Sequence, residues 1–390
     1  MASIQSTARA QIHVPIEIAI EILSRLPVKS LLRFKSVCKT WYALIKSPHF
    51  VSKHLIQSTL NPSPPFSSLL VSTSDTSNNH SSLLHLNHPF HEHTALDYPF
   101  LTEWEDFCIV GNCNGLFCFY KCEYPVILCN PATRDFCRIS NDVWWDHTNV
   151  AFGFGFHPSA NDYKLIRIVS WVCTPDGKFF VQTDMFEMGS NKWREIEAKM
   201  PSVYGEEVVD AVEYEILGCY TSAFLNGVFY WQATVSVSDE VIVVSFDMDN
   251  EVFQIIRTPH TLGGVRIREE IISLTKFVQL KDKLCLIDYH DERCLDVWVL
   301  NGNEKSWTNQ FKIGCFPRIE NLVARGEFWR IRLVGCMKNG DLIVVVLLEP
   351  GDGKLFLYDP KSQETKNLSA FDQVRHLCQI CLYTETLVPV

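Results

Sequence analysis

A short pattern that recurs five times between residues 130 and 368 sets the strongest limit on the fold. Each copy has a polar residue, a position six residues later that is aromatic in four copies, and an apolar position three or four residues beyond that. The copies are Asn130 with Phe136 and Ile139, Glu187 with Trp193 and Ile196, Asp247 with Phe253 and Ile256, Asn301 with Trp307 and Phe311, and Asp359 with Thr365 and Leu368. Their starting points are 57, 60, 54 and 58 residues apart. Periods of this size are typical of propellers and solenoids.

The repeated pattern fits a tight turn between two antiparallel strands. The polar residue hydrogen-bonds its own backbone, and the aromatic side chain packs inward on the outgoing strand. A second hairpin signal, the dipeptide Asn-Gly, lies at residues 114–115, 226–227 and 339–340. Two hairpins per period make a four-stranded blade, and the 330 residues from 61 to 390 hold nearly six periods. We therefore predict a mainly β protein: a propeller of about six blades, closed by pairing of residues 67–71 with residues 378–384.

Residues 14–55 have a helical pattern instead. The first helix, expected over residues 15–25, has apolar residues on one face, at Ile16, Ala19, Ile20 and Leu23. Pro27 interrupts this pattern, Ser30 is the predicted N-cap of a second helix, and a third short helix contains Trp41. Three helices in about forty residues bury too little apolar surface to be secure alone. Some of their apolar residues are therefore expected to face a partner.

The polar, proline-rich segment 61–65 marks a domain boundary. We predict a small α-helical domain at residues 10–56, a linker at 57–66 and the propeller at 67–390. Residues 72–93 are rich in Ser, Thr, Asn and His and are expected to form a long surface loop. The histidines of this segment have no spacing that matches a compact metal site.

The composition, with 47% hydrophobic and 21% charged residues, is that of a globular protein. No apolar run approaches the roughly twenty residues of a membrane span. Glu17 and Glu21 argue against a secretory signal peptide, so we expect an intracellular protein whose 15 cysteines are thiols. Residues 1–60 have a charge balance of +6, which leaves −16 for the rest of a chain whose total is −10. This acidic body disfavours nucleic acid and steers a basic protein partner, or only keeps the protein soluble.

The cysteine pattern does not predict a metal or catalytic site. Six cysteines between residues 108 and 137 lie in strand-like runs, where cysteine is a small apolar filler. His376, Cys378 and Cys381 have ligand spacing, but positions three apart on a strand point to opposite faces, and no second pair accompanies them. The sequence also contains no phosphate-binding Gly-rich loop and no nucleophile elbow. We predict no catalytic residue, metal or cofactor; the rival class is a propeller enzyme with a metal at its axis.

The helical region contains the order Val14-Pro15-x-Glu17-Ile18-Ala19-x-x-Ile22-Leu23-Ser24-x-Leu26, then Leu31, then Val37-Cys38-x-x-Trp41. This order resembles the F-box, with Val14 where the family more often has Leu. The resemblance implies binding to the Skp-family adaptor of a cullin-RING ubiquitin ligase. The implied adaptor-facing residues are Pro15, Ile18, Ile22, Leu23, Leu26, Pro27, Leu31, Val37 and Trp41. The alternative is that these residues form only the internal core of a helical cap.

Motifs of a second kind are spread over the rest of the chain. They are Asn130-Pro-Ala-Thr-Arg134, Gly153-Phe-Gly-Phe156, Asn161-Asp-Tyr-Lys164, Asn226-Gly-Val-Phe-Tyr-Trp231, Ser245-Phe-Asp247 and Glu385-Thr-Leu-Val-Pro389. They resemble the F-box-associated, kelch-like domain of plant F-box proteins, especially the S-locus F-box and S-locus F-box-like members. The resemblance implies a non-catalytic substrate receptor of an SCF ubiquitin ligase, in the cytoplasm or also in the nucleus. The implied substrate is a basic S-ribonuclease of gametophytic self-incompatibility; the alternatives are a regulator of another plant process, such as defence signalling, and a pure scaffold.

Partner recognition is expected in the longer segments that follow each outer strand, because loops on a rigid scaffold usually carry binding. These segments are residues 140–150, 197–218, 257–270 and 312–325. The candidate contact residues are Trp144, Trp145, Glu206, Glu207, Asp210, Glu213 and Glu215. Aromatic side chains concentrate burial, and acidic ones steer a basic partner. Alternatively, the tryptophans pack into a blade and the acids form a solvated face.

Overall fold

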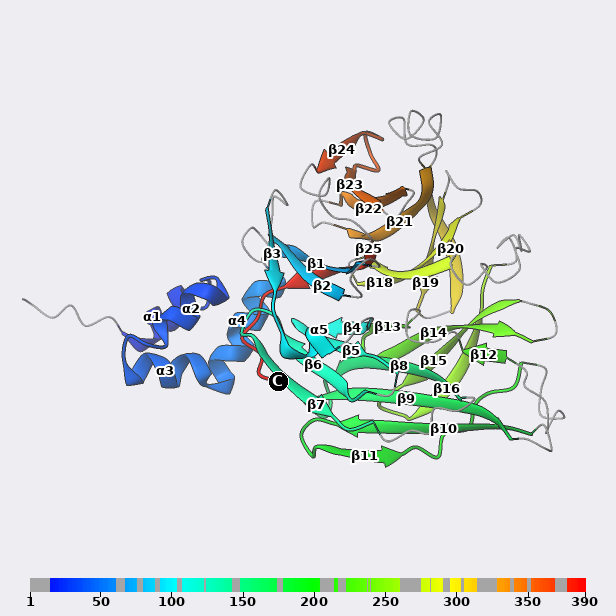
Figure 1. The fold of residues 1–390 in the computed structure, drawn as a ribbon, viewed down its shortest axis with the longest axis horizontal. Helices are drawn as coiled ribbons and strands as arrows, with labels where there is room; N and C mark the ends of the chain where they lie inside the picture. The colour runs from blue at the N-terminus through cyan, green and yellow to red at the C-terminus, as the bar shows by residue number, and fades with distance from the viewer. Residues whose placement is uncertain are drawn as a thin grey trace, which may run out of the picture.

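A computed structural model gives the structure of the chain. The residues it describes are 15–60, 67–75, 80–87, 92–103, 107–122, 124–141, 148–173, 178–203, 214–216, 222–236, 238, 240–259, 275–280, 282–289, 295–302, 305–313, 328–336, 340–348, 352–368 and 377–390. They form two parts, which we call the head (residues 15–60) and the propeller (residues 67–384). Figure 1 shows the helices of the head at one side of the sheets of the propeller.

The strands of the propeller follow one another along almost the whole chain. The first twelve are β1 (Ser67–Asp75), β2 (His80–Asn87), β3 (Glu92–Leu96), β4 (Cys108–Cys113), β5 (Leu116–Tyr120), β6 (Val126–Asn130), β7 (Asp135–Ile139), β8 (Thr148–His157), β9 (Asp162–Cys173), β10 (Lys178–Glu187), β11 (Lys192–Glu195) and β12 (Tyr214–Ile216). The others are β13 (Ser222–Leu225), β14 (Val228–Val235), β15 (Val241–Asp247), β16 (Val252–Arg257), β17 (Thr275–Leu280), β18 (Lys283–Tyr289), β19 (Leu295–Asn301), β20 (Ser306–Ile313), β21 (Phe328–Cys336), β22 (Leu342–Leu348), β23 (Asp352–Tyr358), β24 (Thr365–Leu368) and β25 (Leu377–Thr384). One short helix, α5 (Pro99–Glu103), lies among them.

Within the described residues these strands form six sheets, each built from antiparallel neighbours. The first blade has the order β25-β1-β2-β3, the second β4-β5-β6-β7 and the third β8-β9-β10-β11. In the fourth blade both β12 and β13 pair with β14, which is followed by β15 and β16. The fifth and sixth blades have the orders β17-β18-β19-β20 and β21-β22-β23-β24. The predicted fold class, a mainly β six-bladed propeller behind a small helical part, is confirmed.

The ring is closed by the first and last strands of the propeller. β1 pairs with β25 in antiparallel register, from Ser67 opposite Thr384 to Val71 opposite Ile380. This confirms the predicted closure. Because the join is a hydrogen-bonded strand pair, the first and last strands of the propeller are held together in one blade.

The repeated sequence pattern lies at the turn between the third and fourth strands of blades two to six. The backbone N–H of Arg134 donates to the carbonyl of Asn130 at 2.9 Å, and that of Lys305 donates to Asn301 at 2.9 Å. The residue four positions after the polar residue has a positive φ in every copy: Arg134, Asn191, Glu251, Lys305 and Gln363. This shared turn explains why the pattern keeps its spacing.

The Asn-Gly pairs connect first and second strands. Asn114 and Gly115 have φ of 52° and 81°, and Asn226 and Gly227 have φ of 50° and 81°. Two consecutive positive φ values match the hairpin turn that favours Asn-Gly. Gly340 has a φ of 99°, and Asn339 lies outside the described residues.

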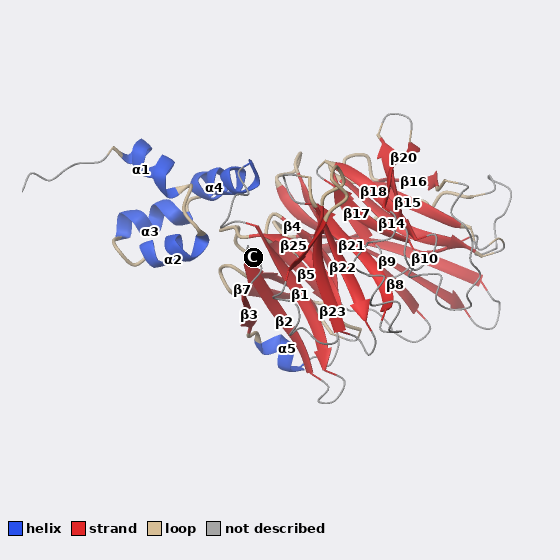
Figure 2. Ribbon diagram, turned by 90° about the horizontal axis from the view of Figure 1, so that it is seen from above, coloured by secondary structure: helices blue, strands red, loops and turns tan. Residues whose placement is uncertain are grey.

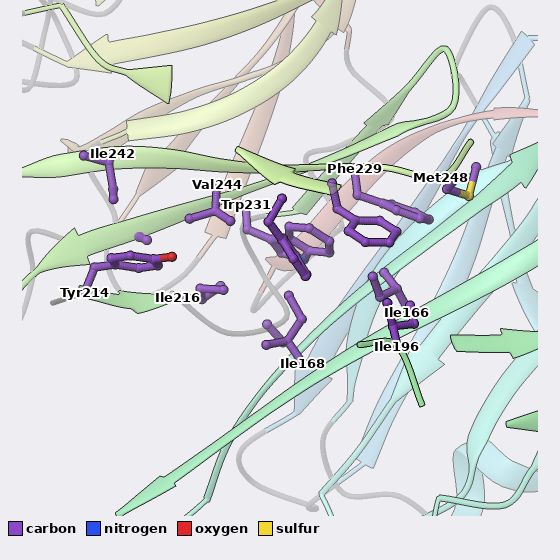
Figure 3. Close-up of a cluster of buried hydrophobic side chains, with 14 of the residues drawn as sticks. Ile166, Ile168, Ile196, Tyr214, Ile216, Phe229, Trp231, Ile242, Val244 and Met248 are labelled. Carbon is purple, nitrogen blue, oxygen red and sulfur yellow. The ribbon is translucent and has the colours of Figure 1, made fainter. Parts of the chain in front are cut away.

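The hydrophobic core lies between neighbouring blades. In the cluster between the third and fourth blades, Trp231 and Phe229 of β14 pack with Ile166 and Ile168 of β9 (Figure 3). The indole N–H of Trp231 donates to the carbonyl of Phe152 in β8 at 2.9 Å. A buried tryptophan with a satisfied N–H fixes the spacing of the two sheets.

The glycines of the Gly153-Phe-Gly-Phe156 motif permit close packing in the same region. A Cβ on Gly155 would lie 2.5 Å from the ring of Phe224 in β13. A Cβ on Gly153 would lie 2.7 Å from the ring of Phe229. Only glycine therefore allows these aromatic rings to lie against β8.

The tryptophans of the repeated pattern also connect blades. The indole N–H of Trp193 donates to the carbonyl of Ser140 at 2.8 Å, and that of Trp307 donates to Arg257 at 3.0 Å. Both acceptors lie at the end of the preceding blade. The prediction that the pattern's aromatic packs inward applies to buried Phe253, whereas the two tryptophans are half-buried and bridge two blades.

The head contains four helices, α1 (Ile16–Leu23), α2 (Val28–Phe34), α3 (Lys39–Lys46) and α4 (Pro48–Leu60). The prediction of Ser30 as an N-cap is wrong, because α2 begins a turn earlier. The carbonyl of Pro27 already accepts from the N–H groups of Ser30 and Leu31, at 3.0 and 3.1 Å. α4 continues to Leu60, so residues 57–60 of the predicted linker are helical.

The prediction of a long surface loop over residues 72–93 is wrong. The segment contains the end of β1, all of β2 and the start of β3. Leu83 and Leu86 of β2 are fully buried, and His85 is buried with its Nε2 2.8 Å from Ser68 Oγ. The polar composition did not indicate strands, because polar side chains such as His85 and Ser68 are buried here and hydrogen-bond each other instead of facing water.

Candidate functional site

The head presents several exposed aliphatic side chains. Ile18 and Ile22 of α1 are 51% and 55% exposed, and Val37, between α2 and α3, is 62% exposed. Of the exposed large hydrophobic side chains in the described part of the chain, six lie in the head and three in the propeller. The small head therefore exposes more large apolar side chains than the described part of the much larger propeller.

α1 is held in place by its other side. Arg25 Nη1 lies 2.9 Å from Glu21 Oε2, and Lys53 of α4 pairs with the same carboxylate. Lys53 and then Arg25 hold the pKa of Glu21 below its usual range by hydrogen bonding to the ionised form. These contacts tie α1 to α4 and leave Ile18 and Ile22 free of the head's interior.

The predicted adaptor-facing residues divide into a surface and a support. Pro15, Ile18, Ile22 and Val37 are exposed; Leu26, Pro27 and Trp41 are half-buried; Leu23 and Leu31 are buried. Leu23 and Leu31 pack with Phe50 in the interior of the head. The structure therefore does not place these two leucines on the surface of the head, because they form part of the core of its four helices.

Two further large apolar residues of the head are exposed, one on α1 and one on α3. Ile16, which the sequence pattern placed on one apolar face of the helix with Leu23, is 43% exposed at the first residue of α1. Tyr42 is 47% exposed, with Lys46 Nζ 5.0 Å from its ring centroid. Sequence reasoning missed Tyr42. Its position next to Trp41, which turns toward the interior, was the available signal.

The carboxyl-terminal tail, residues 385–390, joins the head to the propeller. Leu387 is buried in the core of the head, and Val388 in the cluster between the second and third blades. The side-chain amide of Asn130 donates to the carbonyls of Thr386 and Val388, at 3.1 and 2.7 Å. Figure 2 shows the end of the chain between α4 and the sheets. The tail thus fixes the head on the propeller.

Both head-side turns of the second blade hold this tail. Thr386 Oγ1 donates to the carbonyl of Asn114 at 2.7 Å. A Cβ on Gly115 would lie 2.5 Å from Thr386 Oγ1, so the turn needs a glycine here for the tail to approach. Asn130 Oδ1 accepts from the N–H of Ala132 at 3.0 Å. The sequence predicted Asn130 only as a turn residue. Its complete burial and its hold on the tail are visible only in the structure.

Most of the predicted partner-contacting residues cannot be placed. Trp144, Trp145, Glu206, Glu207, Asp210 and Glu213 lie outside the described residues. Glu215 of β12 is exposed, and its Oε1 accepts from the side-chain amide of Asn149 at 2.9 Å. Asn149 also donates to the carbonyl of Ile216 at 3.0 Å. The start of β8 therefore lies beside β12 on the face of the propeller away from the head.

The residues that follow β7 are fixed by the third blade. Arg167 Nη1 donates to Asn141 Oδ1 at 2.8 Å, and Trp193 holds Ser140. Arg167 is buried with Asp184, at 2.6 Å between Nη2 and Oδ2, and its guanidinium carbon lies 4.3 Å from the Trp193 ring centroid. An ion pair of this kind needs such additional partners to offset its desolvation. The residues just after β7 are therefore held against the third blade on this face.

Metal-binding groups and reactive thiols are the catalytic features considered from the sequence. The described residues contain no group of three or more His, Cys, Asp or Glu side chains that could hold a metal ion, and His376 lies outside them. Burial raises the pKa of Cys113 and of Cys285 to about 12, so these thiols stay protonated and are weak nucleophiles. In the part of the chain that the structure describes, no helix is long and apolar enough to span a membrane.

Two sequence families match the chain. The F-box domain matches residues 12–53, and the F-box associated beta propeller domain matches residues 64–376. The first match ends within α4, and the second covers nearly all of the propeller. Together they coincide with the head and the propeller.

Curated relatives are similar over most of their length. The F-box protein At3g07870 of Arabidopsis thaliana is 25% identical over 91% of this chain and 87% of its own. The F-box/kelch-repeat protein At3g23880 of Arabidopsis thaliana is 28% identical over 77% of this chain and 79% of its own. Among solved structures, TolB from Acinetobacter baumannii is similar with a TM-score of 0.48 and 10% identity, over 86% of this chain and 73% of its own.

Proposed function

Because the chain belongs to the F-box proteins that carry an F-box associated β-propeller domain, we propose that it is the substrate-recognition subunit of an SCF-type cullin-RING ubiquitin ligase. In this proposal the head binds a Skp-family adaptor and the propeller binds a protein that is to be ubiquitinated. The chain itself supplies no catalytic group.

The observation that carries the proposal is the exposed face of the head. Ile18, Ile22 and Val37 are more than half exposed, although α1 is tied to the rest of the head by Glu21 and Leu23. A face that stays apolar while its supports are buried suits a protein partner. We assign this face to the adaptor.

The arrangement of turns supports separate sites for adaptor and substrate. The head contacts the second blade at Ala132 and, through the tail, at Asn114, which lie in turns on one face of the propeller. Because antiparallel strands alternate in direction, the ends of β7, β11, β16 and β20 lie on the opposite face. A substrate bound there would not compete with the adaptor for space.

The charge of the chain favours a basic substrate. Residues 61–390 carry −16 of formal charge, since the first 60 residues carry +6 and the total is −10. An acidic receptor accelerates the approach of a basic protein. A basic secreted S-ribonuclease is one candidate, and a target in defence signalling is the other; we propose Trp144, Trp145 and the acids between Glu206 and Glu215 as contact residues.

The docking proposal is tested by changing exposed residues only. The double variant Ile18→Glu with Ile22→Glu places two charges on the proposed face without touching a buried side chain. We expect at least a hundredfold loss of affinity for a purified Skp-family adaptor, measured by biolayer interferometry. Burying an unpaired carboxylate against an apolar partner is strongly unfavourable.

The matched control is Val252→Glu, an exposed aliphatic residue of the propeller, 46% exposed. It should bind the adaptor like the unchanged chain. Equal adaptor affinity for the double variant and this control would contradict the docking assignment. Accumulation of a bound protein when the proteasome is blocked would separate a receptor from a scaffold.

A further inference from the structure

The third blade has an unusually long strand next to a short one. β10 runs from Lys178 to Glu187, whereas its outer neighbour β11 has four residues. Their pairing covers only the stretch from Asp184 opposite Glu195 to Glu187 opposite Lys192. Among the described residues, no strand pairs with the first part of β10 on its outer side.

The backbone of Val181 faces this open side. The N–H of Ile196 donates to the carbonyl of Thr183 at 2.8 Å, so the backbone groups of Thr183 point away from β9. Residues two apart in a strand point the same way. The N–H and C=O of Val181 are therefore directed outward, where the described part of the chain offers them no strand partner.

The same stretch exposes large apolar side chains. Phe180 and Val181 are 42% and 39% exposed. In the described part of the propeller, Val252 is the only other large apolar residue that is exposed. Phe180 stacks on Trp171 of β9, with ring centroids 5.6 Å apart and an angle of 17° between the planes. Proteins usually protect an apolar strand edge, because it invites another strand.

The surrounding charges indicate which strand would bind. Glu195 and Glu197 flank Ile196, are exposed and form no ion pair with the described residues. A second copy of this chain would bring the same two acids to the edge and be repelled. An extended segment with a basic residue would be attracted. This end of β10 also lies on the face of the propeller away from the head.

We propose that the open edge of β10 accepts an extended segment of the substrate as an added strand. Val181 supplies the backbone hydrogen bonds, Phe180 with Trp171 packs against an apolar side chain, and Glu195 and Glu197 select a basic residue. Adding a strand to a sheet edge is an established form of peptide recognition. The inference rests on the receptor function proposed above, and it assigns the class of substrate segment.

The test uses the full chain and nine-residue peptides selected on it from a random displayed library. Val181→Pro removes the outward N–H but no hydrogen bond to β9, and proline is tolerated on strand edges. We expect the selected peptides, enriched in apolar residues beside Lys or Arg, to bind Val181→Pro at least tenfold more weakly in fluorescence polarisation. Val181→Thr, which keeps the N–H, should bind them within twofold of the unchanged chain.

Equal affinity for Val181→Pro and the unchanged chain, or a selection that yields no binder, would overturn the proposal. A dimer seen by sedimentation and abolished by Val181→Pro would assign the edge to a second copy and also overturn it. If Val181→Pro does not fold, the selected peptides are N-methylated at alternate amides and tested on the unchanged chain. A tenfold loss of peptide affinity supports strand addition at the edge of β10, and an unchanged affinity contradicts it. Adaptor affinity, measured in parallel, distinguishes failure of this site from failure of the receptor function.

Discussion

The head and the propeller treat their apolar residues in opposite ways. The propeller buries aromatic side chains such as Trp231 and Phe229 between blades, and among its described residues only three large apolar side chains are exposed. The head has a small core around Leu31 and Phe50 and exposes several aliphatic side chains on α1 and beyond. In the propeller, therefore, an apolar residue in the sequence chiefly indicates a side chain packed in the core. In the head, an apolar residue belongs either to the core or to the proposed binding surface, and only its burial in the structure distinguishes these roles.

The most direct test of this difference is to truncate one buried and one exposed residue of the head and to compare the effects on stability. Leu31→Ala should lower the free energy of unfolding of the head by about 2–5 kcal/mol, because it leaves a cavity in a four-helix core. Ile22→Ala should change it by less than about 0.5 kcal/mol, because its side chain is solvated in the free chain. Native-state hydrogen exchange of the α2 amides measures both values.

The propeller amides serve as the internal control, since neither change touches a blade. A loss of stability from Ile22→Ala as large as that from Leu31→Ala would show that the division into surface and support is wrong.

The second prediction concerns the link between the two regions. Asn130→Ala should destabilise the docked tail by about 1–3 kcal/mol, because the buried carbonyls of Thr386 and Val388 lose their donor. The matched change is Asn301→Ala, at the same position of the repeated pattern, where the side-chain amide donates to the hydroxyls of Ser306 and Thr308, at 3.4 and 2.7 Å, and to no buried carbonyl of the described residues. Carboxypeptidase digestion should release the tail residues faster from Asn130→Ala alone. Equal rates for the two variants would contradict the role given to Asn130.

The sequence predicted the repeat, its turns and the closure of the ring because these follow from local chemistry. A positive φ at a fixed position of a turn, and an Asn-Gly pair at a hairpin, each depend on only one or two neighbouring residues. It failed at β2, where His85 and Ser68 satisfy each other, and at Ser30, where the preceding proline decided the helix start. The support role of Leu23 and the tail contacts of Asn130 depend on residues far apart in the chain. No local pattern contains them.

The third prediction concerns the pH dependence of stability at His85, which lies beside Glu385 of the tail. Burial lowers the pKa of His85 to about 4, below its ordinary 6.5, so between these values the unfolded chain binds a proton that the folded chain does not. Stability from His85 is therefore lost as the pH falls from about 6.5 towards 4. Nearby Glu385, 3.9 Å from His85 Nε2, has a pKa raised by burial and acts in the opposite direction.

The variant His85→Gln separates the two contributions. Between pH 7 and pH 5 it should lose about 2 kcal/mol less stability than the unchanged chain, because glutamine cannot take up the proton that His85 binds in the unfolded chain. Chemical denaturation at the two pH values measures this difference. Identical pH dependence of the two proteins would mean that His85 does not titrate as its burial requires.

The central claim is that an exposed apolar face on the head, and not the propeller, receives the adaptor. Hydrogen exchange of the full chain with and without a purified Skp-family adaptor tests it directly. We predict new protection in α1 and around Val37, with unchanged exchange in β10 and at the blade ends away from the head. Protection confined to the propeller, or none in α1 at saturating adaptor, would contradict the account.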